Sequence, residues 1–381
     1  MSSTATYPCC PQRPFNIFPG KLSVLYTIFI VLCMIMPYLC VVNGWVFLEN
    51  RVSQKCSFVA GGSKNNYAYA ASTERKNNMD NKFLLSCEST LDLPYSYTTE
   101  RGIPVIFYTY VLDGTEHEDN MGRDPEVSEN FYRSIYDGKL PTTSLVTEHR
   151  YEEYFEGLLQ STELPILHLA FSSGLTPSVR KAMAAAATVK QKYPDRRLEV
   201  IDTMCGGSGL GLLAELTADL RDEGKSIDEA LEWVNENRFH VQHEFFSTDL
   251  KYLRRSGRVS GAVAMIATVL GICPIMKVIH DGKIIAYEKV RGKRHAIRRI
   301  VDAMEKHCGN PSEYSTKCYV GHSDCPEDAE RMKQEILDRF PLLTVDSVRI
   351  VNIGTILASH CGPGTVAVFF MGDERKAESE D

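Results

Sequence analysis

Short apolar runs alternate with longer amphipathic stretches between residues 82 and 240, and this alternation is the main structural signal of that region. Four of the runs are rich in branched and aromatic residues, which is the composition of strands. They lie at 83–86, 103–111, 165–171 and 197–202. Stretches with helical spacing separate them, at 128–138, 147–161 and 178–193. Strands that alternate with helices predict a parallel sheet that is covered on both faces.

The pattern changes after residue 240, where strands of mixed direction are expected. Two apolar runs flank the residues His280-Asp281-Gly282-Lys283, and this arrangement predicts a β-hairpin. The remaining elements are expected in the order helix, strand, helix, strand, strand, at 293–306, 317–323, 326–340, 347–354 and 364–372. We therefore predict a two-lobed α/β fold, with a parallel-sheet lobe at 79–240 and a mixed-sheet lobe at 241–381.

Residues 22–48 form an apolar segment without any Asp, Glu, Lys, Arg or His. The segment is long enough to span a bilayer core, which needs about 20 apolar residues. Most of the flanking basic residues follow it, so an anchor here would leave the C-terminal body in the cytoplasm. Two other interpretations stay open: a secretory signal, and a translated region outside a working protein that begins at Met79. In each case residues 1–78 are an N-terminal extension.

Composition and charge narrow the class of protein. Of the 381 residues, 44% are hydrophobic and 24% are charged, as in an ordinary folded protein. The net charge of −7 divides into +5 for residues 1–78 (7 basic, 2 acidic) and −12 for residues 79–381 (35 basic, 47 acidic). An acidic body argues against a nucleic-acid partner. The 12 cysteines include no C-x-x-C pair, so we expect a reduced, cytoplasmic body without a metal, a cofactor or a disulfide framework.

Hydroxyl and glycine residues follow several of the predicted strands. Ser172-Ser173-Gly174 lies at the sheet edge where open α/β sheets bind ligands, although a simple helix cap would also explain a hydroxyl nearby. Thr142-Thr143-Ser144, taken alone, is typical of a loop that enters a helix. The glycine-rich turn at 205–211 has neither the dinucleotide nor the P-loop spacing, which favours a tight turn with close helix packing. Arg258 and His360 both lie near glycines, where an Arg is usually solvated and a His could be a turn residue.

Together and in order, these motifs resemble the DegV family of bacterial fatty-acid-binding proteins. The resemblance begins with Glu88-Ser89-Thr90-Leu91-Asp92-Leu93-Pro94, which is close to the D-S-x-x-D-L-P opening of that family. The other matching segments are 141–144, 172–175, 200–203, 250–253, 257–260, 274–275, 290–292 and 360–364. Each motif is weak by itself, whereas the ordered set over residues 82–372 is specific.

The resemblance implies a carrier and not a catalyst. It implies two α/β lobes with a long-chain fatty acid buried between them. The carboxylate would be held by hydroxyls that correspond to Thr143 and to Ser172 or Ser173, and Arg258 and His360 match basic residues near the carboxylate end. In the family, the protein presents the fatty acid to a separate fatty acid kinase, which makes the acyl phosphate.

The chain departs from the family pattern at two positions, and other functions stay open. Glu88 stands where Asp is usual, and the segment 175–179 (LTPSV) replaces the usual L-S-G-T-Y beside the carboxylate site. The apolar stretch 262–275 is a candidate tunnel wall or ordinary core. The alternatives are an acyl hydrolase with a Ser nucleophile and His360, an enzyme that handles sugars or dihydroxyacetone, and a membrane-tethered interaction protein without a ligand. The hydrolase lacks a G-x-S-x-G elbow and an evident Asp for His360.

Overall fold

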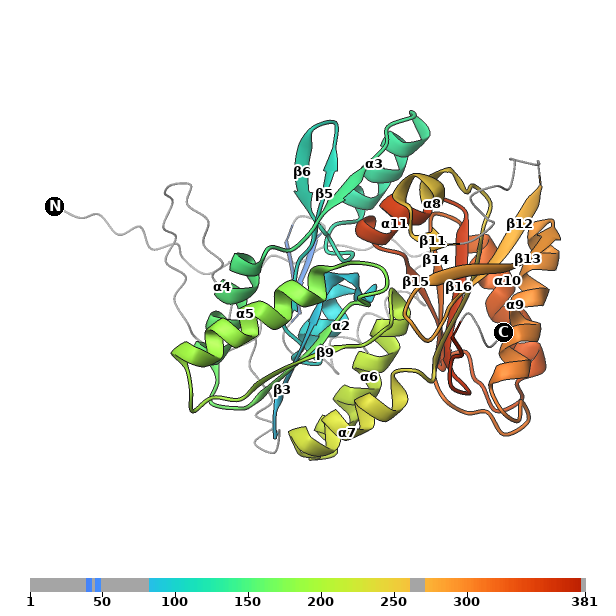
Figure 1. The fold of residues 1–381 in the computed structure, drawn as a ribbon. Helices are drawn as coiled ribbons and strands as arrows, with labels where there is room; N and C mark the ends of the chain where they lie inside the picture. Colours follow the sequence, from blue (N-terminus) through green and yellow to red (C-terminus); the bar gives the residue numbers. More distant parts are fainter. Residues whose placement is uncertain (1–38, 43–44, 49–81, 261–270, 378–381) are drawn as a thin grey trace, which may run out of the picture. The chain divides into compact units, whose positions relative to one another are not determined.

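The computed structural model describes residues 39–42, 45–48, 82–260 and 271–377 (Figure 1). The chain divides into two compact units, residues 1–73 and 74–381. In the first unit, β1 (Leu39–Val42) and β2 (Trp45–Leu48) pair antiparallel, so the described part of the predicted anchor consists of strands. Over the described ranges, no helix is long and apolar enough to cross a membrane. The other residues of segment 22–48 lie outside the described residues.

A four-stranded parallel sheet forms the centre of the first half of the second unit, as the sequence predicts. The strands lie in the order β4-β3-β8-β9. Their bounds, in that order, are Val105–Ile106, Leu84–Glu88, Ile166–Ala170 and Leu198–Asp202. All five residues of β8 are buried, as expected for a parallel strand with both faces covered.

The prediction of one continuous strand over 103–111 is wrong. Only β4 belongs to the parallel sheet, while β5 (Thr109–Leu112) pairs antiparallel with β6 (Thr115–Glu118) and β7 (Thr142–Ser144) in a separate sheet. Asp113 and Gly114 connect β5 to β6, with φ angles of 52° and 77°. Asp-Gly with two positive φ angles is the preferred two-residue hairpin turn, and this pair is the sequence signal that the prediction missed.

Helices cover both faces of the parallel sheet (Figure 1). α4 and α5 pack together on one face, and α6 packs against β3 on the other. The helices of this half are α2 (Tyr95–Glu100), α3 (Pro125–Tyr136), α4 (Glu148–Ser161), α5 (Ser178–Lys192), α6 (Ser208–Asp222) and α7 (Ile227–Asn237). Ser226 caps the start of α7, and its side chain forms a reciprocal capping box with Glu229.

A seven-stranded mixed sheet forms the second half, in the order β11-β13-β12-β10-β16-β14-β15. The bounds in that order are Val259–Ser260, Ile284–Arg291, Ile272–Val278, Val241–Ser247, Thr365–Met371, Cys318–His322 and Val348–Asn352. The predicted hairpin is confirmed, since β12 and β13 pair antiparallel. The sequence did not predict β10, because its Gln242-His243-Glu244 segment is polar although every residue of the strand is buried.

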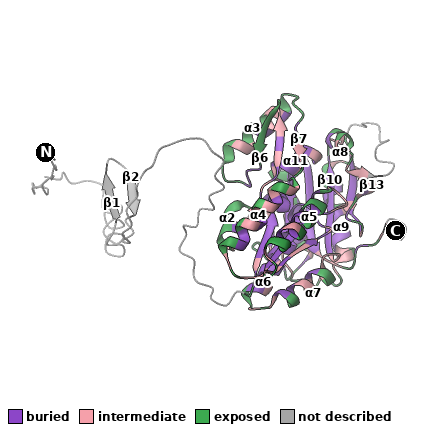
Figure 2. Ribbon diagram, turned by 60° about the vertical axis from the view of Figure 1, so that its left-hand side comes forward, coloured by how far each residue is buried: buried purple, intermediate pink, exposed green. Residues whose placement is uncertain are grey.

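The two sheets share α6 as a common middle layer. α6 packs against β3 on one side and against β10, β14 and β16 on the other, and 11 of its 15 residues are buried. Helices α9 (Lys293–His307) and α10 (Pro326–Arg339) pack on the seven-stranded sheet. Figure 2 shows the buried residues concentrated in the sheets, with exposed residues on the outer helices. We call β3 to α7 the first lobe and β10 to β16 the second lobe.

Candidate ligand-binding site

One hydrogen bond between the lobes joins two of the residues that the sequence predicts for the site. Thr143 lies on β7 of the first lobe, and His360 lies on α11 (Thr355–Cys361) of the second. Thr143 Oγ1 is 2.9 Å from His360 Nε2. His360 is therefore not a turn residue, because it occupies the last turn of a helix. Its other nitrogen, Nδ1, is buried without a hydrogen-bond partner among the described residues.

Two buried carboxylates of the first lobe hold the opposite end of α11. Asp92 Oδ1 accepts a hydrogen bond from the Gly354 amide at 3.0 Å, and Asp119 Oδ1 accepts one from the Thr355 hydroxyl at 2.9 Å. Burial, and then the charge of Asp119, raise the pKa of Asp92 well above its ordinary value. Burial also raises the pKa of Asp119. The helix that carries His360 is thus anchored from the other lobe.

The surroundings of His360 carry an excess of positive charge. Burial, Arg258 and Arg255 together lower the pKa of His360 to about 4. Both arginines bind main-chain carbonyls: Arg258 donates to the oxygens of Leu175 and Ser256, and Arg255 donates to those of Pro141 and Ser359. Neither has a carboxylate partner among the described residues. Sequence motifs identified Arg258 but missed Arg255, whose role depends on contacts between distant segments.

The two predicted serines have different surroundings. Ser172 is fully buried, and its hydroxyl donates to the Gly282 carbonyl at 2.9 Å, in the hairpin turn between β12 and β13. A Cβ at Gly282 would lie 2.1 Å from Ser172 Oγ, so the contact requires this glycine. Ser173 is half-buried, and its hydroxyl makes only a long contact of 3.8 Å with Met204 Sδ. No hydrogen bond joins either serine to the Thr143–His360 pair in the described part of the chain.

The loop that begins with Ser172-Ser173, which we call the serine loop, is nevertheless connected to the surroundings of His360 through Arg258. Its Nε donates to the carbonyl of Leu175, 3.3 Å away, in the loop that follows Ser172-Ser173. Its Nη1 donates to the carbonyl of Ser256, and the preceding residue, Arg255, donates to the carbonyl of Ser359 beside His360. Thr143, the serine loop, Arg258 and His360 therefore border one junction between the lobes. Hydroxyls, cations and a neutral imidazole at such a junction can bind an anionic head group.

The family assignment rests on comparison with known proteins. The family model described as "Uncharacterised protein, DegV family" matches residues 82–373. The chain belongs to the DegV family. A DegV domain-containing protein of Clostridium perfringens is 35% identical over 296 residues, which cover 77% of this chain and 99% of that protein. A second DegV domain-containing protein, from Lactococcus lactis, is 30% identical over 75% of this chain and 96% of its own length.

Solved DegV structures share the fold. A DegV protein of Thermus thermophilus, described for its fatty acid binding, matches with a TM-score of 0.67 and 25% identity over 77% of this chain and all of that chain. A stearic acid-binding protein of Eubacterium ventriosum matches with a TM-score of 0.68 and 22% identity, over 76% of this chain and 98% of its own. The DegV fold, with a parallel sheet and a mixed second sheet, is therefore established for this chain.

The two departures from the DegV pattern are in contact with the same side chain. Tyr151 donates to Glu88 Oε1 at 2.5 Å, and its hydroxyl lies 3.2 Å from Ser178 Oγ. Glu88 also accepts hydrogen bonds from the Tyr108 hydroxyl and from the Phe171 amide, which directly precedes Ser172. The longer Glu88 side chain and the altered helix entry thus form one buried cluster behind the serine loop.

The glycine-rich turn has the packing role that the sequence favours. Gly207 begins α6 with a φ of 55°, and a Cβ at Gly209 would lie 2.1 Å from His243 Nε2. His243 Nε2 accepts a hydrogen bond from the Gly206 amide at 3.1 Å. The glycines therefore let β10 of the second lobe approach the start of α6, as expected for close helix packing.

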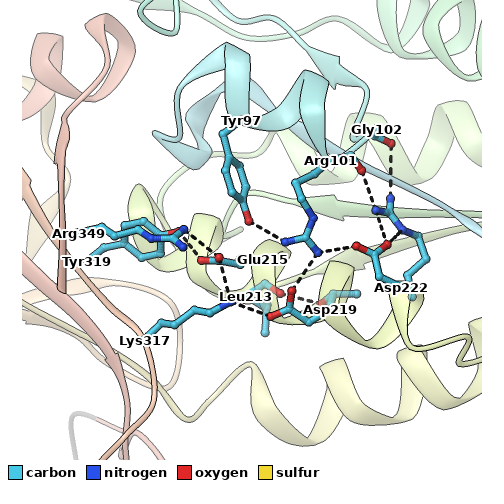
Figure 3. Close-up of polar contacts among 12 residues, drawn as sticks. Tyr97, Arg101, Gly102, Leu213, Glu215, Asp219, Asp222, Lys317, Tyr319 and Arg349 are labelled. Atoms are coloured by element: carbon cyan, nitrogen blue, oxygen red, sulfur yellow. Dashed lines mark hydrogen bonds and ion pairs between the residues drawn. The ribbon is translucent and has the colours of Figure 1, made fainter. Parts of the chain in front are cut away.

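A second polar cluster joins the lobes around α6 (Figure 3). Glu215, which is 1% exposed, accepts hydrogen bonds from Lys317, Arg349 and the Tyr319 hydroxyl. Although burial alone would raise it, the bonds from Tyr319 and Lys317 hold the pKa of Glu215 below its ordinary value. Arg101 of the first lobe extends the cluster through Asp219 and Asp222. Acidic and basic groups pair throughout this cluster.

One surface hollow of the second lobe lies apart from these groups. A hollow of about 640 Å³ is open to solvent and is lined by β13 and α9 residues, among them Arg291, Arg298 and Asp302. It shares no residue with the Thr143–His360 junction, so we do not assign the ligand to it. Most of the predicted tunnel wall at 262–275 falls outside the described residues, and its last residues belong to β12.

Proposed function

We propose that the protein binds a long-chain fatty acid between its lobes, with the carboxylate at the Thr143–His360 junction. Thr143 and the serine loop donate hydrogen bonds to the carboxylate, while Arg258 and Arg255 supply positive charge. The protein then presents the bound fatty acid to a separate fatty acid kinase, which transfers a phosphoryl group from ATP to the carboxylate. Solved DegV proteins described as fatty-acid-binding support the choice of ligand class.

The observation that carries the proposal is the uncompensated charge beside His360. Arg255 and Arg258 have no acidic partner in the described part of the chain, and they add to the burial that lowers the pKa of His360. A bound carboxylate would compensate both cations and raise the pKa of His360. The junction is therefore electrostatically suited to an anion.

The geometry favours a carrier over a hydrolase. Thr143 and His360 lie at the distance of a nucleophile–base pair, but no acidic side chain in the described part of the chain orients Nδ1 of the imidazole. A base with a pKa of about 4 is also too weak to deprotonate a hydroxyl at neutral pH. We therefore assign no catalytic residue to this chain.

Burial of the acyl chain would provide most of the affinity. About fourteen methylenes at ~0.8 kcal/mol each give roughly 11 kcal/mol before the costs of association. The polar end needs only to keep the carboxylate hydrogen-bonded, since an unpaired buried carboxylate is costly. A few hydroxyls suffice and leave the head group accessible to a partner enzyme.

Two measurements on the full chain test the proposal. We expect mass spectrometry of the purified, denatured protein to detect a long-chain fatty acid, and we expect the delipidated protein to bind oleate. A folded protein that releases no lipid and binds neither oleate nor palmitate would contradict the proposed ligand. The kinase step is tested separately, because addition of a fatty acid kinase and ATP should yield an acyl phosphate only when the loaded carrier is present.

A further inference from the structure

Arg255 connects the two halves of the Thr143–His360 pair through the main chain. It lies at the end of α8 (Lys251–Ser256), in the second lobe. Its Nη2 donates to the carbonyl of Pro141, two residues before Thr143, and to the carbonyl of Ser359 at 3.2 Å, directly before His360. One guanidinium nitrogen thus binds both segments whose side chains meet across the lobes.

We propose that Arg255 is a positioning residue that holds Thr143 and His360 in register for carboxylate binding. The inference rests on the proposed function, and it adds a residue that the hydroxyl and basic motifs do not include. A lysine could keep the positive charge, but its tetrahedral ammonium on a flexible stem does not reproduce the planar guanidinium that contacts both carbonyls. Arg255→Lys should therefore keep the positive charge while it loses the hydrogen bonds that position the two segments.

The charged groups around α11 show which side chains lower the pKa of His360. α11 packs against α8, β5 and β7. The charged or titratable side chains on these elements and in the turn after α8 are Lys251, Tyr252, Arg254, Arg255, Arg258 and Tyr110, and β7 carries none. Asp92 and Asp119 contact the other end of α11, at Gly354 and Thr355. Of these, Arg258 and Arg255 lower the pKa of His360.

Arg254 provides a matched control for Arg255. It is the preceding residue, it is also exposed, and its side chain makes no hydrogen bond or ion pair among the described residues. Arg254→Gln removes the same charge from the same helix without breaking a contact between the lobes. An effect that Arg255→Gln has and Arg254→Gln lacks is therefore specific to Arg255, and Arg255→Lys then separates its charge from its bridging hydrogen bonds.

The experiment measures three quantities on the full-length protein: oleate affinity, the NMR pKa of His360, and the ¹⁵N shifts of its ring. We expect Arg255→Gln to weaken oleate binding about tenfold and to raise the His360 pKa. Arg255→Lys should weaken binding similarly while the pKa stays low, and it should change the Nε2 shift as the Thr143 bond loosens. Arg254→Gln should alter none of the three.

Two results would overturn the inference. One is an Arg255→Lys variant that binds oleate like the wild type with an unchanged Nε2 shift, because charge alone would then explain the residue. The other is an Arg255→Gln variant with unaltered affinity and His360 pKa. Since the NMR measurements need no ligand, they test Arg255 even if the wild-type protein binds no oleate, and that last result would contradict the proposed function instead.

Discussion

Two of the polar regions where the lobes meet have opposite charge balance. Around Glu215, the acidic side chains of α6 are paired with Arg101, Lys317 and Arg349 (Figure 3). Around His360, Arg255 and Arg258 bind only main-chain carbonyls among the described residues, and burial together with these cations lowers the pKa of the imidazole. Both regions lie between the two lobes. Among the described residues, the Glu215 cluster pairs acidic with basic side chains, whereas the arginines around His360 have no acidic partner.

This difference separates a structural junction from a binding junction. Buried ions are tolerated when opposite charges and hydrogen bonds compensate them, as at Glu215. Around His360 the cations have carbonyl partners and no carboxylate among the described residues, so an anion can still pair with them. The comparison therefore predicts that changes at Glu215 affect stability, whereas changes around His360 affect ligand affinity.

We expect the largest loss of stability in the Glu215 cluster. Glu215→Ala leaves Lys317 and Arg349 without their buried partner, and we expect the free energy of unfolding to fall by about 3 kcal/mol. Urea denaturation measures the change. Asp222→Ala is the control on the same helix, since its ion pairs are more exposed and should contribute less than about 1 kcal/mol. Equal losses in both variants would contradict the structural role of Glu215.

At the Thr143–His360 junction, we expect substitutions to change ligand affinity more than stability. Thr143→Val removes the hydroxyl with little change of shape, and the loss of a hydrogen bond to a charged group costs about 1.5–3 kcal/mol. We therefore expect oleate affinity to fall tenfold to a hundredfold, while the lost bond to His360 lowers the free energy of unfolding by only about 1 kcal/mol. Thr142→Val is the matched control, because Thr142 is the adjacent, exposed residue of the same strand. If the two variants lost the same affinity, Thr143 would have no specific role.

An intermediate effect is expected at Asp92, which holds α11 from the first lobe. Asp92→Ala removes the acceptor for the Gly354 amide and should lower the free energy of unfolding by about 1–2 kcal/mol. Asp92→Asn keeps an acceptor there and should be nearly as stable as the wild type. Urea denaturation of the two variants side by side tests this order.

The pH dependence of the Asp92 variants provides a further check. The folded-state pKa values of Asp92 and Asp119 are raised, so between the unfolded and folded values the folded protein holds more protons. Their ionisation therefore reduces stability as the pH rises above about 4, the unfolded value. Asp92→Asn should flatten this decline, and an unchanged pH profile would contradict the proposed acid pair.

Much of the fold was predictable because its signals are local. The parallel strands, the hairpin at 280–283 and the cap at Ser226 each follow from apolar pattern or turn chemistry within a short segment. β10 was not predictable in this way, since its polar residues are satisfied by contacts with distant segments, such as the bond from the Gly206 amide to His243. Burial of polar residues is a property of the tertiary structure and leaves no periodic pattern.

The candidate site was less predictable for the same reason. Thr143 and His360 were identified through ordered family motifs, and they are 217 residues apart in the chain. Arg255 and the Asp92–Asp119 pair act through main-chain atoms and a helix end, so residue type alone does not indicate their role. The motifs also treated Ser172 and Ser173 as equivalent, whereas the structure distinguishes them by burial and by partner.

The smallest expected effects separate these two serines. The Ser172 hydroxyl already donates to the Gly282 carbonyl in a fully buried contact between lobes, so Ser172→Ala should cost about 1 kcal/mol of stability. Ser173 is half-buried, and its hydroxyl has no oxygen or nitrogen partner among the residues that the structure describes. Ser173→Ala should therefore leave stability unchanged and weaken oleate binding about tenfold. Urea denaturation and oleate titration of both variants distinguish the roles. If Ser172→Ala instead reduced oleate affinity without loss of stability, the roles of the two serines would be reversed. Ser172 would then rotate to bind the carboxylate.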